Sequence, residues 1–151
     1  MNLTIDGIQE GATIPDRYTC NGAGFSPEIS WDMVPLGTVS LAFIMDDLDA
    51  PRGPFTHWTV WHIPANTRRL PSNLTRKAEL PNGIRQGVNS CGTFGFYPSC
   101  PPPGPAHRYI YKLLALDYEP QLAPGAGREQ FDQAITGHVM AEVTITGLYS
   151  R

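Results

Sequence analysis

The hydrophobic residues of this chain recur mainly in short segments with a period of two, which is the spacing of a β-strand with one buried face. Leu3–Ile5 and Glu28–Trp31 alternate in this way, and Val143–Thr146 repeats the pattern near the end of the chain. Val39–Met45 is apolar almost throughout and is followed by two aspartates, which is typical of a buried central strand. These segments predict a β-rich fold.

The segment Phe55–Ile63 gives the clearest strand pattern in the chain, and Pro64 is expected to end it. The period of two divides this strand into two faces. One face then carries Phe55, His57, Thr59 and Trp61, and the other carries Thr56, Trp58, Val60 and His62.

Arg108–Leu116 predicts a further long strand, with Tyr109, Tyr111 and Leu113 on one face. One helix is expected from about Arg128 to Thr136, and Gly137 can end it. Its apolar residues recur at a spacing of 3.6; they are Phe131, Ala134, Ile135 and Val139.

The 151 residues predict a single domain, residues 1–151, that is long enough to bury a core. The chain has 15 glycines and 15 prolines, which lie between the apolar segments and therefore indicate turns. Many short strands with one late helix predict a mainly-β sandwich.

The formal net charge is -3, and no basic stripe of the kind that nucleic-acid surfaces carry is present. We therefore expect no nucleic-acid partner. The start of the chain does not resemble a signal peptide, and the longest apolar segment is too short to cross a membrane. We accordingly expect no integral membrane association and a cytoplasmic location.

Three cysteines, Cys20, Cys91 and Cys100, occur without CxxC spacing. This odd number argues against both a zinc site and a disulfide framework. One bridge is still compatible with the sequence, either Cys91–Cys100 or Cys20 with one of the other two. The reducing cytosol favours free thiols, so that is the expected state.

Four polar residues fall at predicted strand ends or on strand faces: Asp47, His57, His107 and Tyr109. If their three strands are neighbours in a sheet, the side chains converge at one rim. Two imidazoles, a carboxylate and a phenol suit a small anion with a cationic tail, because imidazoles donate hydrogen bonds to phosphate oxygens near neutral pH. The set therefore predicts an anion-binding site.

The segment CPPPGPAHRY leads into this predicted site. Prolines have no N–H group, so the first backbone donors here belong to Gly104 and Ala106. The prolines are therefore expected to form a stiff wall.

Each of these residues also has a plain structural interpretation. The DDLDAP stretch that contains Asp47 could be only a turn, and His57 could be a core histidine. His62, beside Pro64, is expected to be structural or exposed. His138 is expected to pack or cap at the helix end.

The chain has no HExxH, GxSxG, GxxxxGK[ST] or GxGxxG motif. We therefore expect no metal, no cofactor and no catalytic residue. The alternative is a hydrolase or other acid–base enzyme that uses Asp47, His57 and His107. A third possibility is an inert, purely structural site.

Four segments resemble the phosphatidylethanolamine-binding proteins, in the bacterial and archaeal branch similar to Raf kinase inhibitor protein. In order they are IPDRYTCNGAGFSPEISW, SLAFIMDDLDAPRGPFTHWTVWHIP, CPPPGPAHRYIYKLLALD and GHVMAEVTITGLYSR. The chain departs from the family pattern at Leu48, where the family has a proline, and at Tyr97–Cys100, where it has a glycine-proline lead-in.

The resemblance implies a central antiparallel sheet, a smaller second sheet and one or two helices. It also implies a small anion-accepting cavity in which Asp47, His57, Pro101, Gly104, His107 and Tyr109 bind a phosphate-like anion or phospholipid headgroup. Asp49 is expected to shape the turn, and Arg108 to point away from the site. Further expectations are modulation of a protein kinase or protease partner, and a homodimer.

Overall fold

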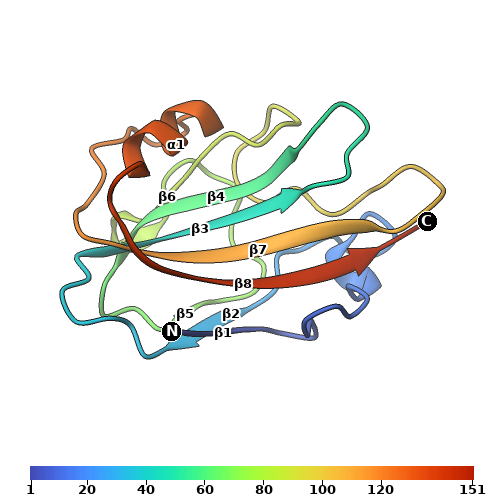
Figure 1. The fold of residues 1–151 in the computed structure, drawn as a ribbon. Coiled ribbons are helices and arrows are strands. Elements are labelled where there is room, and N and C mark those ends of the chain that lie inside the picture. Colours follow the sequence, from blue (N-terminus) through green and yellow to red (C-terminus); the bar gives the residue numbers. More distant parts are fainter.

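The computed structural model describes residues 1–151 and consists mainly of β-strands (Figure 1). Five strands form one antiparallel sheet in the order β6-β4-β3-β7-β8. These strands are β3 (Ser40–Asp47), β4 (Phe55–Pro64), β6 (Arg85–Gln86), β7 (His107–Leu116) and β8 (Val139–Tyr149). The predicted central strand is indeed the middle one, β3.

A second, smaller antiparallel sheet has the strand order β1-β2-β5. Its strands are β1 (Asn2–Ile5), β2 (Ile29–Asp32) and β5 (Arg69–Leu70). The helical elements are the 3-10 turns η1 (Asp16–Tyr18) and η2 (Pro81–Gly83) and the helix α1 (Arg128–Ile135). The expected mainly-β sandwich with two sheets is confirmed.

Two hydrophobic layers flank the large sheet, and Figure 1 shows α1 and the small sheet on its opposite sides. The inner layer is a cluster of 21 buried residues that includes Phe43, Trp58 and Tyr111 of the large sheet and Ile29 of the small one. The outer layer is a cluster of 6 buried residues, in which Phe131 of α1 packs among side chains of β3, β4 and β7. The central strand β3 is thus buried on both faces, which explains its almost continuous apolar sequence.

The predicted faces of β4 are wrong beyond its first residues, because the strand contains two irregularities. The register with β3 shifts between Met45 and Asp46 and again between Leu41 and Phe43. Each shift inserts an extra residue on β4, as in a β-bulge, and so reverses the alternation. As a result Trp58 and Val60 join the inner cluster.

The first shift also decides where His57 lies. Asp46 pairs with Thr56 and Met45 with Trp58, so His57 is the extra residue. Its ring lies 4.7 Å from the ring of Phe55 and 5.3 Å from that of Tyr109, measured between centroids. The bulge therefore turns His57 toward the same side as Tyr109.

The C-terminal elements agree with the prediction except at one boundary. The helix begins at Arg128 as expected, and Gly137 follows it with a φ of 82° in the left-handed region. Val139, which was assigned to the apolar face of the helix, instead begins β8. No helix in the structure has the length and apolar character needed to cross a membrane.

The expectation of three reduced cysteines is wrong, because Cys20 and Cys100 form a disulfide. The backbone brings them together: Thr19 and Ser99 form a parallel bridge, and the Cys20 N–H donates to the Ser99 carbonyl at 3.1 Å. The two Cα atoms are therefore 5.3 Å apart although 80 positions separate the residues in the sequence. Cys91 is free and exposed.

Candidate functional site

A cavity of about 220 Å³ lies at the end of the large sheet where β3 ends and where β4 and β7 begin. Five of the six predicted site residues line it: Asp47, His57, Pro101, His107 and Tyr109. The sheet register explains why they meet, because Asp47 pairs with Phe55 on one side and with Tyr109 on the other. The structure therefore brings together residues that lie up to 62 positions apart.

Gly104, the sixth residue, does not line this cavity. It is exposed, and its N–H donates to the carbonyl of Arg151 at 3.2 Å. The proline run turns outward after Pro102, so the wall of the cavity consists of Cys100, Pro101 and Pro102.

His107 is held by a buried carboxylate. Its Nδ1 atom is 2.7 Å from Oδ2 of Asp47, and the two side chains are only 11% and 6% exposed. The other oxygen of Asp47 accepts the backbone N–H of Asp49 at 2.8 Å. Because Nδ1 is engaged, Nε2 is the ring nitrogen of His107 that remains available to a ligand.

His57 is oriented by a backbone carbonyl. Its Nδ1 lies 2.7 Å from the carbonyl oxygen of Tyr97. A carbonyl only accepts, so Nδ1 carries the hydrogen and donates it. Burial lowers the pKa of His57, although this hydrogen bond and the charge of Asp47 oppose the shift. The ring is therefore neutral near pH 7, with Nε2 free.

Tyr109 forms the floor of the cavity. Its side chain is fully buried, and its hydroxyl makes no hydrogen bond of good geometry within the protein, although Asp47 and Ser99 lie close enough to affect its pKa. Burial, with the nearby charge of Asp47, raises the pKa of this phenol, so it stays protonated and can donate. A buried hydroxyl without a partner is uncommon and costs about 1–3 kcal/mol.

The three aspartates of the DDLDAP stretch have three different partners. Asp46, on the outer face, binds Arg128 at the start of α1, and Asp47 binds His107. Asp49 accepts from the Arg108 backbone at 2.9 Å and from its guanidinium, which lowers the pKa of Asp49 to about 2. Asp49 thus ties the turn to β7, and Arg108 engages it there rather than lining the cavity.

The other two histidines lie away from the cavity. Nε2 of His62 is 2.7 Å from the carbonyl oxygen of Pro120. His138 stacks on Tyr118 and lies 2.7 Å from the carboxylate of Asp117. Both have the structural role expected from the sequence.

Sequence reasoning missed five further residues of the lining: Ala50, Pro51, Phe55, Cys91 and Tyr97. Phe55 could have been found, because it precedes the bulged His57 by two residues in the same strand. Tyr97 and Cys91 belong to the segment after β6, and no local pattern connects that segment with β4.

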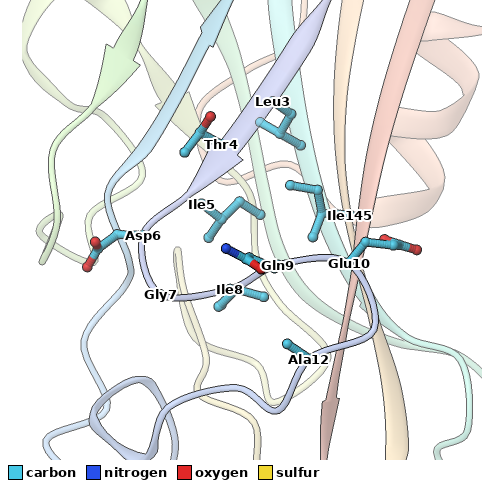
Figure 2. Close-up of a pocket in the computed structure, with 10 residues that line it drawn as sticks. All are labelled: Leu3, Thr4, Ile5, Asp6, Gly7, Ile8, Gln9, Glu10, Ala12 and Ile145. Carbon is cyan, nitrogen blue, oxygen red and sulfur yellow. The ribbon is translucent and has the colours of Figure 1, made fainter.

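A larger hollow of about 650 Å³ lies between β1 and β8 (Figure 2). Ile5, Ile8 and Ile145 line it together with Gln9, and Figure 2 shows Asp6 and Glu10 pointing away from the isoleucines. Asp6 accepts from the Tyr18 hydroxyl, and Glu10 accepts the N–H of Thr146 at 2.8 Å. Because both charged groups already have partners, this hollow has fewer polar groups free to bind a ligand than the cavity at His107 has.

Acidification is expected to destabilise the protein through His57. Its pKa is lower in the folded state than its ordinary value of 6.5, so the unfolded chain binds the proton more readily. The stability that the neutral ring contributes is therefore present above about pH 6.5 and is lost as the pH falls below it. Urea unfolding at pH 7.5 and pH 5.5 should show that the free energy of unfolding falls more for the wild type than for His57→Gln. An equal fall in the two proteins would contradict this.

The protein is a β-sandwich with a small cavity at one end of its larger sheet, lined by an aspartate, two histidines and a tyrosine among apolar residues. The family model for phosphatidylethanolamine-binding protein matches residues 4–150. The chain therefore belongs to the phosphatidylethanolamine-binding protein family, as the resemblance of its motifs indicated. Membership of this family favours ligand binding over the acid–base enzyme.

The relatives span the whole chain. A UPF0098 protein of Methanothermobacter thermautotrophicus is 44% identical and covers 100% of this chain and 99% of its own length. A UPF0098 protein of Aquifex aeolicus is 45% identical, with 100% of this chain and 89% of its own length aligned. The crystal structure of Escherichia coli YbcL, described as a new member of the mammalian PEBP family, has a TM-score of 0.92, 32% identity and coverage of 99% and 98%.

Proposed function

We propose that this protein binds a small oxyanion in the cavity at His107, and that its ligand class is a phosphate group or a phosphorylated headgroup such as phosphoethanolamine. The observation that carries the proposal is the Tyr109 hydroxyl, which is buried without a partner beside two imidazole rings. A phosphate oxygen would accept from this hydroxyl.

The surrounding groups complement such a ligand. A protonated His107 would donate from Nε2 to the anion while Asp47, at 2.7 Å, stabilises the imidazolium. His57 would donate from its own Nε2 once the anion favours its protonation. The aromatic faces of Phe55 and Tyr97, whose rings are 5.9 Å apart at the same cavity, suit the ammonium end of an ethanolamine headgroup.

The same chemistry supports a regulatory role. A phosphorylated side chain of a protein presents the same oxyanion as a headgroup, so we include modulation of a protein kinase or protease in the proposal. An inhibition assay against such an enzyme, with and without competing phosphoethanolamine, tests this part. Inhibition that the competitor leaves unchanged would argue against the cavity as the docking point.

Titration with phosphate, followed through the imidazole resonances by NMR, tests the proposal. The resonances of His57 and His107 should shift, and the pKa of His57 should rise, because a bound anion favours the charged ring. His62 lies outside the cavity and serves as an internal control. Unchanged His57 and His107 resonances at millimolar phosphate would overturn the proposal, and turnover of a phosphoester would favour the enzyme.

The homodimer and the cytoplasmic location stay predictions. Light scattering during size-exclusion chromatography tests the first.

A further inference from the structure

The free cysteine of the chain lies at the cavity just described. Cys91 is exposed and contributes to the lining together with Tyr97, His57 and His107. Its thiol raises the pKa of the Tyr97 phenol, mainly by hydrogen bonding to it. The other two cysteines are paired with each other. An exposed thiol and the cavity at His107 thus share one opening.

The backbone around Cys91 is held in place by a buried side chain. Oδ1 of Asn89 accepts the N–H of Cys91 at 3.0 Å and that of Thr93 at 3.2 Å. Nδ2 of Asn89 donates to the carbonyl of Gly95 at 3.0 Å. The backbone position of Cys91 beside the cavity is therefore held by the fold.

A second observation points to a ligand at the same place. Tyr109 lines the same cavity, and its buried hydroxyl makes no hydrogen bond of good geometry within the protein. A molecule that carries both an anionic group and a sulfur electrophile could satisfy this hydroxyl at one end and reach Cys91 at the other.

We propose that Cys91 is a site of covalent modification by small anionic disulfides, and that the resulting mixed disulfide closes the cavity to other anions. This inference rests on the proposed function, because the anionic end of the disulfide uses the oxyanion site. The modification would act as a redox control of ligand binding.

The chemistry balances without any further oxidant. The Cys91 thiol loses a proton to water, and its thiolate attacks one sulfur of the disulfide R–S–S–R. The S–S bond of the reagent breaks, R–S⁻ leaves with the electron pair, and a Cys91–S–S–R bond forms. The thiol is oxidised and the departing half of the reagent is reduced.

The test uses the full chain with dithiobis(nitrobenzoate), a dianionic disulfide whose released thiolate is coloured. One thiolate should be released per folded wild-type chain and none from Cys91→Ser. Phosphate at about nine times its dissociation constant should slow the reaction about tenfold, because only the unoccupied fraction reacts. Chloride at equal ionic strength should not slow it.

A matched control moves the thiol away from the cavity. In the Cys91→Ser background, Ser72→Cys places a cysteine at an exposed position that does not line the cavity. Phosphate should leave its reaction rate unchanged. The modified wild type should also lose the phosphate-dependent shifts of His57 and His107, whereas treatment with the same reagent should not change the response of Cys91→Ser to phosphate.

The outcomes separate the two proposals. If phosphate shifts the histidine resonances but neither protects Cys91 nor is excluded by its modification, this inference is overturned and the proposed function stands. A folded chain whose Cys91 does not react also overturns the inference. If phosphate does not bind at all, both proposals fail.

Discussion

The double variant Cys20→Ser/Cys100→Ser should unfold with a free energy about 4 kcal/mol lower than that of the wild type. The disulfide links residues 80 positions apart, and its removal restores the conformational entropy of a long loop to the unfolded chain. Urea unfolding without reductant measures the difference. Cys91→Ser, which removes the free thiol, should unfold like the wild type.

The disulfide should also affect the cavity, since Cys100 and Pro101 form its wall. Five prolines in the segment 98–105 leave few N–H groups for other anchors. We expect the double variant to bind phosphate more weakly than Cys91→Ser does. Equal unfolding free energies and equal affinities in the two variants would show that the disulfide supports neither the fold nor the wall.

Tyr109→Phe should weaken phosphate binding at least tenfold without loss of stability. The substitution removes a hydroxyl that has no partner in the protein, so folding loses no hydrogen bond and no longer buries an unsatisfied group. A bound anion, in contrast, loses a hydrogen bond to a charged group, which is worth about 1.5–3 kcal/mol. Calorimetric titration with phosphate and urea unfolding measure the two effects separately.

Tyr149→Phe is the matched control, because the Tyr149 hydroxyl is fully engaged. It donates to Asp16 at 2.7 Å and accepts from Asn21 at 2.7 Å and from Thr19 at 3.0 Å. This variant should lose stability and keep its affinity for phosphate. If Tyr109→Phe behaved in the same way, the hydroxyl of Tyr109 would have a structural role and no part in binding.

The fold class could be predicted because strands that are buried in a two-sheet sandwich show a local pattern of apolar residues. The long strands β3, β4 and β7 each show it within ten residues. The two-residue strands β5 and β6 are too short to show any period, and none was predicted for them. The bulges of β4 were not predicted from the sequence. Each one depends on how many residues of β3 pair with the bulged segment of β4, and that number is not visible in β4 alone.

The candidate site was predicted to the extent that its residues stand at the ends of long strands. Asp47, His57, His107 and Tyr109 all do, and the cavity contains all four. Cys91 and Tyr97 come from a segment whose position is decided by tertiary contacts such as the hydrogen bond from Tyr97 N–H to the His57 carbonyl. The Cys20–Cys100 pairing likewise depends on the contact between Thr19 and Ser99, which has no local signature.

The Cys20–Cys100 bond also divides the molecule mechanically. It closes a ring that holds β2 to β6, while β1, β7, α1 and β8 lie on the two tails. In the large sheet the boundary between ring and tail falls between β3 and β7. A force applied to the two ends of the chain would peel away β1, β7 and β8 and could not extend the rest. Under tension the oxidised protein would therefore open at the strand that carries His107 and keep the strands that carry Asp47 and His57.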